Sequence, residues 1–157
     1  MTRIEFDMYD MMASDRHQTK MDSRRKGAVT KKACNPKNDK VGFLGELAVK
    51  KYLDSMEIEY EEHADDTGKY GDTWDIKIAG EKIDVKASER YKDKIVLNED
   101  QYNKALKHNT RLIGVHINLS IEHGDIIGKC FPKDLERDES EDFTYKGKEI
   151  KMYSKKF

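Results

Sequence analysis

The sequence predicts an α/β domain with a mixed central β-sheet of about five strands, flanked by helices. Two patterns carry this prediction. Apolar and polar residues alternate over 72–88, which is typical of a β-hairpin with one face on a core. Apolar residues instead recur at helical spacing over 41–54 and 99–108, on either side of that hairpin. Helices therefore interleave with strands, an order that favours a sheet with both parallel and antiparallel pairs.

The composition suggests one domain with an uneven distribution of charge. The chain has 157 residues, of which 39% are charged, and its net charge is only -1. Residues 16–40 hold nine basic and two acidic side chains, whereas residues 41–84 hold twelve acids and five lysines. We therefore expect a basic N-terminal arm over 1–40, partly helical or flexible, followed by the main domain over 41–157.

A basic arm beside an acidic body indicates a polyanionic partner, although the same charges suit an arm that is only solvated. If the arm binds nucleic acid, we expect its phosphate contacts to come from Arg24, Arg25, Lys26, Lys31 and Lys32. No apolar run approaches the roughly 20 residues that span a membrane, and the first residues show no signal-peptide pattern. The sequence thus predicts a cytoplasmic protein outside the membrane.

The first long helix is expected over 41–54. Its apolar side is formed by Val41, Leu44, Leu47, Ala48 and Tyr52. Glu46 lies at the margin of this side, where a carboxylate can enter a cleft. The simpler alternative is a surface ion pair with Lys50, one turn later. Gly45 lowers helix propensity but allows another backbone or a ligand to come close.

The hairpin over 72–88 follows a strand expected over 57–62 and a loop over 63–73. Gly80-Glu81 suits its two-residue turn, because glycine supplies a positive φ there. Asp75 would then project from the first strand, and Asp84 and Lys86 from the second, all away from the core. Two carboxylates and one ammonium group in a small area indicate a hard-cation site with a lysine beside it.

The remaining elements follow from local signals. Asn98 is the expected N-cap of the helix over 99–108, and Gln101 completes a capping box. The most apolar stretch, 111–119, predicts a central strand, and the next strand is expected over 126–131. Pro132 starts a short helical turn, and 143–153 suggest a terminal hairpin.

Three short motifs resemble the PD-(D/E)XK nuclease superfamily, which has the restriction-endonuclease-like fold. They are Gly45-Glu46-Leu47-Ala48, Trp74-Asp75-Ile76 and Ile83-Asp84-Val85-Lys86. The resemblance covers roughly 41–117, and the expected element order matches the family core, α-β-β-β-α-β. Trp74 stands where the family signature has proline. The glycine–glutamate helix looks most like resolvase-type and small phage or restriction-type members.

The resemblance implies metal-dependent hydrolysis of phosphodiester bonds, with Mg²⁺ as the cofactor and Mn²⁺ as a substitute. Asp75 and Asp84 would bind the metal together with the backbone carbonyl of Val85. Lys86 would orient or deprotonate the attacking water, and Glu46 would hold a second metal or a metal-bound water. A carboxylate-bound Mg²⁺ is suited to this chemistry, because it activates water and relieves negative charge.

Three weaker candidates lie near these residues. Asp72 could replace Asp75 as a ligand, although it falls in the expected loop. Ser88 shares the expected face of Asp84 and could contact a phosphate. Gln101 opens the helix after the motif, where some relatives of the superfamily have a glutamine, but its capping box explains it without a catalytic role.

Two classes of function remain open. The first is a metal-dependent endonuclease, acting on duplex or branched DNA rather than RNA; a Holliday-junction resolvase and an RNA-cleaving nuclease are alternatives within this class. The second is a nucleic-acid-binding protein of the same fold without catalysis. The complete set of Glu46, Asp75, Asp84 and Lys86 favours the first class, because a degenerate relative would be expected to lack at least one. Cutting two strands would imply a homodimer, since one catalytic set cuts one strand.

Overall fold

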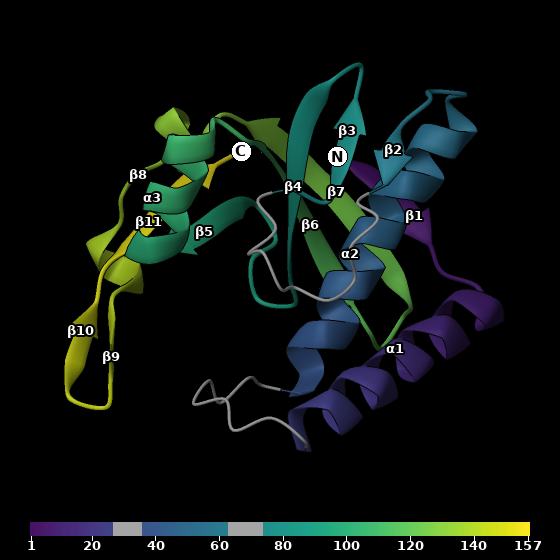
Figure 1. The fold of residues 1–157 in the computed structure, drawn as a ribbon, viewed down its shortest axis with the longest axis horizontal. Helices are drawn as coiled ribbons and strands as arrows, with labels where there is room; N and C mark the ends of the chain where they lie inside the picture. The colour runs from purple at the N-terminus through teal and green to yellow at the C-terminus, as the bar shows by residue number, and fades with distance from the viewer. Residues whose placement is uncertain (27–35, 63–73) are drawn as a thin grey trace.

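The computed structural model describes residues 1–26, 36–62 and 74–157, and their main feature is one mixed sheet of six strands (Figure 1). The order across this sheet is β1-β7-β6-β4-β3-β2. Its strands are β1 (Thr2–Glu5), β2 (Glu61–Glu62), β3 (Ile76–Ile78), β4 (Glu81–Ser88), β6 (Arg111–Asn118) and β7 (His123–Cys130). The α/β class with a mixed sheet is thus confirmed, with one strand more than expected.

One parallel pair, β4 with β6, lies near the middle of the sheet, and the other strand pairs described in this sheet are antiparallel. A parallel pair needs a crossover connection. Here the crossover contains β5 (Lys94–Asn98) and α3 (Glu99–His108). Gln101 and Asn98 form the expected capping box at the start of α3.

A second, smaller sheet has the order β5-β11-β8, and a separate hairpin pairs β9 with β10. The bounds of these strands are β8 (Glu136–Arg137), β9 (Phe143–Tyr145), β10 (Lys148–Ile150) and β11 (Met152–Lys156). Two short 3-10 turns precede the hairpin, over Pro132–Asp134 and Glu139–Glu141. The hairpin bends at Lys146-Gly147, where both residues have positive φ, as the sequence suggested.

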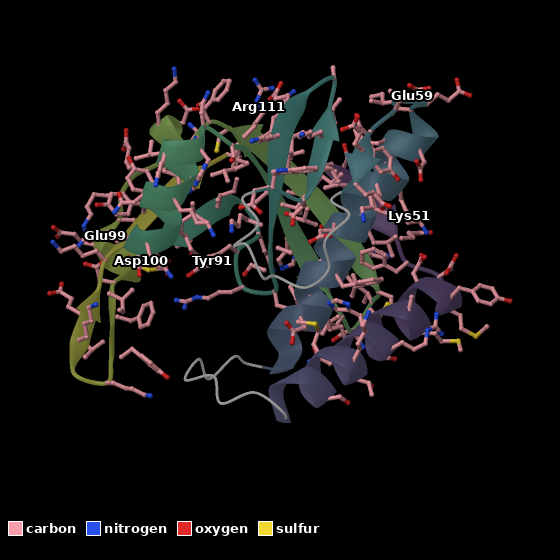
Figure 2. All side chains as sticks on the ribbon, viewed as in Figure 1. Lys51, Glu59, Tyr91, Glu99, Asp100 and Arg111 are labelled. Carbon is pink, nitrogen blue, oxygen red and sulfur yellow. The ribbon has the colours of Figure 1, made fainter. Side chains whose placement is uncertain are left out.

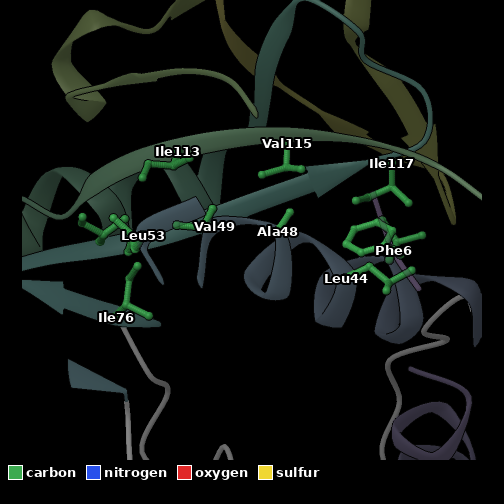
Figure 3. Close-up of a cluster of buried hydrophobic side chains, with 11 residues drawn as sticks. Phe6, Leu44, Ala48, Val49, Leu53, Ile76, Ile113, Val115 and Ile117 are labelled. Atoms are coloured by element: carbon green, nitrogen blue, oxygen red, sulfur yellow. The ribbon is translucent and has the colours of Figure 1, made fainter. Parts of the chain in front are cut away.

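The main core lies between α2 (Pro36–Ser55) and the sheet (Figure 3). Leu44 and Ala48 of α2 and Ile76 of β3 are fully buried in it, and Ile117 of β6 is nearly so. Burying a leucine or isoleucine side chain is worth about 1.5–3 kcal/mol, so this cluster holds α2 firmly on the sheet. A second cluster joins β5, α3 and β6 to β7 and includes the fully buried Leu97 and Leu112.

The N-terminal residues are built into this fold, which differs from the expected arm. β1 pairs with β7 along the sheet edge, and Phe6 is buried against α2. α1 (Met8–Lys26) packs beside α2, and Lys51 of α2 forms an ion pair of 2.5 Å with Asp10 of α1. The boundary expected between residues 40 and 41 falls inside α2, which begins at Pro36 because proline suits the first position of a helix.

Two local expectations shift by a few residues. The strand expected over 57–62 is only β2 (Glu61–Glu62), because the chain turns directly after α2, with Glu57 at a positive φ of 55°. The turn of the β3–β4 hairpin is Ala79-Gly80 rather than Gly80-Glu81. Both turn residues have positive φ, as a two-residue turn of this kind requires.

Among the residues that the structure describes, no helix combines the length and apolar character needed to cross a membrane. Many nitrogen- and oxygen-bearing side chains cover the surface (Figure 2), and α1 also exposes Met8, Tyr9 and Met12.

Candidate functional site

Four of the expected site residues lie together where α2 packs against the β3–β4 hairpin. They are Glu46, Asp75, Asp84 and Lys86. Gly45 explains why α2 comes so close to β4: a Cβ atom at this position would lie 2.4 Å from the Cβ of Ala87. Such a separation is far below van der Waals contact, so only glycine is compatible with the observed packing. The close approach brings Glu46, the next residue, to the carboxyl groups of the hairpin.

Asp75 occupies the point where β3 and β4 separate. Its N–H donates to the Ile83 carbonyl at 2.8 Å, and its Oδ2 accepts from the Val85 N–H at 2.7 Å. The side chain of Asp75 thus adds one hydrogen bond to the β3–β4 pairing, just outside the N-terminal end of β3. The N–H and C=O of one strand residue face the same edge, so the Val85 carbonyl faces this opening beside Asp75.

Asp84 and Lys86 lie on one face of β4, two residues apart. The Lys86 Nζ is 2.9 Å from the Asp84 Oδ2, and the two side chains are 28% and 23% exposed. The carboxyl group of Asp75 lies beside those of Asp84 and Glu46, and both of them shift its pKa. The four groups therefore form a continuous line, from Glu46 through Asp75 and Asp84 to Lys86.

Burial is the main cause of the raised pKa values of these acids. It raises the pKa of Asp75 to about 6, helped by the charge of Glu46. It raises the pKa of Asp84 to about 7, an effect that Lys86 opposes and Asp75 strengthens. Burial also raises the pKa of Glu46, against a hydrogen bond with Asp75. Lys86 borders Asp84 and the charge of Lys50 reaches Glu46, but full ionisation of all three acids still leaves an excess of negative charge.

The donors suit a magnesium ion held by few protein ligands. In the described residues, no group of three or more His, Cys, Asp and Glu side chains could hold a metal ion as it stands. Mg²⁺, however, is usually bound through one or two carboxylates and keeps several waters. Asp75, Asp84 and the Val85 carbonyl make up such a set, and the excess negative charge around them is the charge that a cation would neutralise.

Pockets open on both sides of the line of acids. One, of about 240 Å³, lies between α1 and α2, and Glu46 lines it together with Lys20 and Lys50. Another, of about 200 Å³, lies beyond Lys86 and is also lined by Tyr91. Neither Lys20 nor Tyr91 belongs to a motif, and only the tertiary fold brings them to the site, so sequence reasoning did not select them.

The weaker candidates have structural roles that are now visible. The Ser88 Oγ accepts from the N–H groups of Arg90 and Tyr91, at 3.0 and 3.3 Å, and so closes the turn after β4. The Gln101 Oε1 accepts from the Asn98 N–H at 3.0 Å, as the capping box requires. Ser88 and Gln101 nevertheless both line the pocket beyond Lys86.

Other expected residues fall where the structure gives no side-chain position. Asp72, Lys31 and Lys32 lie outside the described residues. Arg24 and Arg25, followed by Lys26, form the last turn of α1, but their side chains lie outside the described part of the chain. Comparison of the chain with protein-family models, with curated proteins and with solved structures found no match.

Proposed function

We propose that this chain is a metal-dependent endonuclease that hydrolyses phosphodiester bonds in DNA, and that its sheet is a restriction-endonuclease-like core. The order α2, β2, β3, β4, α3, β6 supports the second part, since it follows the α-β-β-β-α-β order of the PD-(D/E)XK superfamily. The parallel pairing of β4 with β6, across the crossover that contains α3, supports it further. β5 is an addition within that crossover.

The observation that carries the proposal is the convergence of Glu46, Asp75 and Asp84 with one lysine. These acids come from a helix, a strand end and a strand, and each has a pKa raised by burial. Burying several acids with too little positive charge lowers stability, so such a cluster is typical of functional sites. A purely structural role would not explain it, because an apolar cluster of the same shape would be more stable.

Asp75, Asp84 and the Val85 carbonyl would hold Mg²⁺, which when bound supplies Lewis-acid activation of water and relief of phosphate charge. The Val85 N–H fixes the orientation of the Asp75 carboxylate. Lys86 is placed to orient the attacking water or to stabilise negative charge on the phosphate, since its ammonium group borders both Asp84 and the pocket beyond. Glu46 orients a water from the opposite side, at the pocket that it shares with Lys20.

The position of α1 supports a nucleic acid as the substrate. Its Lys20 lines the same pocket as Glu46, and Lys50 of α2 lines it too. The helix then continues into the basic residues 24–26. Phosphates need such cationic groups near an acidic centre, because the acids alone would repel a polyanion.

Cleavage assays test the proposal directly. Purified protein would be incubated with plasmid, duplex and branched DNA, in Mg²⁺, Mn²⁺ or excess EDTA, beside the Asp84→Asn and Glu46→Gln variants. We expect cleavage by the unmodified chain in either metal, and none in EDTA or by Asp84→Asn. Tight binding of DNA without cleavage in any metal would instead favour the alternative of a non-catalytic binding protein. If Asp84→Asn cleaved DNA as fast as the unmodified chain, the assignment of the catalytic site would be wrong.

A further inference from the structure

The β9–β10 hairpin carries an aromatic face that belongs to neither hydrophobic cluster of the described chain. Its strands pair only with each other among the described strands. Phe143 and Tyr145, two residues apart, share one face of β9 and are 48% and 46% exposed. Their partners across the ladder are Ile150 and Lys148, so the same face also carries an ammonium group.

The root of this hairpin is held by a network of charged hydrogen bonds. The Arg137 guanidinium binds both oxygens of Asp142, and the Asp142 Oδ1 accepts from the Met152 N–H at 2.9 Å. The hydroxyl groups of Ser140 and Ser154 donate to the two oxygens of Asp138, and these bonds lower the pKa of Asp138 to about 2. The acids at the root are thus engaged within the protein, and the hairpin itself projects from the rest of the fold (Figure 1).

The same network connects the hairpin to the catalytic strand. Glu141, just before the hairpin, accepts from the Tyr91 hydroxyl at 2.8 Å and from the Lys94 Nζ at 2.7 Å. Tyr91 lies in the loop that follows β4 (Figure 2), and it lines the pocket beyond Lys86. The base of the hairpin therefore lies beside the pocket on the Lys86 side of the acids.

The chemistry of the face suits nucleic acid with unpaired bases. Residues 143–151 contain Lys146, Lys148 and Lys151 against one acid, Glu149. The Lys146 Nζ lies 5.4 Å from the centre of the Tyr145 ring. Aromatic rings beside lysines bind single strands by stacking on the bases while the lysines contact the phosphates. In a continuous duplex the base faces are already stacked, so this surface selects bases that are unpaired.

We propose that the β9–β10 hairpin is a stacking platform for unpaired bases next to the scissile phosphate, and that the substrate is a gapped, flapped or branched nucleic acid. The proposal rests on the proposed function for the identity of the site, but its binding step does not require cleavage. A second copy of the chain is a less suitable occupant, because two such faces would bring their lysines together.

The test compares Phe143→Ala/Tyr145→Ala with Thr144→Ala, a control on the opposite face of the same strand. Affinity is measured in EDTA for a duplex with a single-stranded gap and for a continuous duplex of equal length. We expect the double variant to bind the gapped DNA roughly 10- to 100-fold more weakly, and the continuous duplex within about twofold of the unmodified chain. A 2-aminopurine in the gap should be quenched by the unmodified chain and by Thr144→Ala, but not by the double variant.

The outcomes separate this proposal from the proposed function. Suppose that the protein cleaves DNA but Phe143→Ala/Tyr145→Ala does not change its affinity for gapped DNA. The stacking-platform proposal would then be overturned, and the proposed nuclease function would stand. Gap binding that depends on the two rings, without cleavage in Mg²⁺ or Mn²⁺, would uphold the platform and overturn the nuclease. A dimer in size-exclusion chromatography that the double variant converts to a monomer, with unchanged DNA binding, would show a self-association face and overturn the platform. Circular dichroism of each variant confirms that it is folded before binding is compared.

Discussion

Replacing Asp84 with asparagine should stabilise the metal-free protein at neutral and alkaline pH. Burial raises the pKa of the Asp84 carboxyl from 3.8 to about 7; Lys86 opposes the rise and Asp75 adds to it. A carboxyl group whose pKa is higher in the folded chain costs folding free energy once it ionises. This cost begins near the unfolded pKa, grows with pH, and is complete above the folded pKa. Asparagine keeps the shape of the side chain and removes the charge.

The magnitude follows from the pKa. A tenfold change in an ionisation constant is worth about 1.4 kcal/mol, so a rise from 3.8 to about 7 corresponds to about 4 kcal/mol at full ionisation. The pKa of about 7 already includes the favourable ion pair of 2.9 Å with Lys86. We take about 2 kcal/mol as the net gain, because a buried amide with imperfect hydrogen bonds carries its own cost. In a chain of this size that gain corresponds to roughly 4–8 °C in Tm.

The assay is thermal unfolding followed by circular dichroism, in EDTA, at about pH 8, 6 and 4.5. The gain in Tm should be largest at the highest pH and should shrink steadily as the pH falls toward the unfolded pKa. Glu59→Gln, at an exposed acid after α2 (Figure 2), is the control and should change Tm by less than about 1 °C. An Asp84→Asn protein that melts no higher than the unmodified chain at pH 8, or whose gain is independent of pH, would refute the reasoning.

Three further predictions follow from the site. Mg²⁺ at about ten times its Kd should stabilise the unmodified chain by about 1.4 kcal/mol and leave Asp84→Asn unchanged; equal rises in Tm for both proteins would argue against a metal at Asp84. Lys86→Met should slow cleavage by roughly 10²–10⁴-fold while the Kd for DNA stays within about threefold; a main effect on Kd would make Lys86 a phosphate-binding residue. Gly45→Val should lower stability by about 1–3 kcal/mol and abolish cleavage, because its Cβ would meet Ala87. Gly42→Ala is the matched control, because a Cβ atom at this position would have no neighbour within 4 Å. It should keep its stability in denaturant unfolding and its activity in the cleavage assay.

The face of the hairpin on which Asp84 lies was predictable, because it depends only on the alternation of residues along one strand. Alternation with a period of two puts Asp84 and Lys86 on the same face of β4, and this expectation holds even though the turn is one residue earlier than predicted. The contact of Glu46 with Asp75 was harder to predict, since it depends on how closely α2 packs on β4. Gly45 was the available signal, because a glycine inside a helix often marks a close approach.

Long-range features could not be derived from the sequence. β1 has only four residues, too few for alternation to identify it, and it is defined by its pairing with β7. α2 begins at Pro36, five residues before the helix expected over 41–54. The hydrogen bond between Tyr91 and Glu141 joins residues 50 positions apart, and no local pattern predicts such a pair. Periodicity determines which face a residue occupies, but not which distant element covers that face.

The pairing of β1 with β7 has a consequence for how the chain folds during synthesis. Arg3 and Asp125, which form an ion pair of 2.8 Å across these strands, are separated by 122 residues. β1 therefore leaves the ribosome long before β7, which in chain order is the last strand of the main sheet. At about 5–20 residues per second this delay is roughly 6–24 s. Throughout that interval β1 lacks its partner strand, although α2, against which Phe6 packs, is made much earlier, so this edge of the main sheet is the last part of it to close.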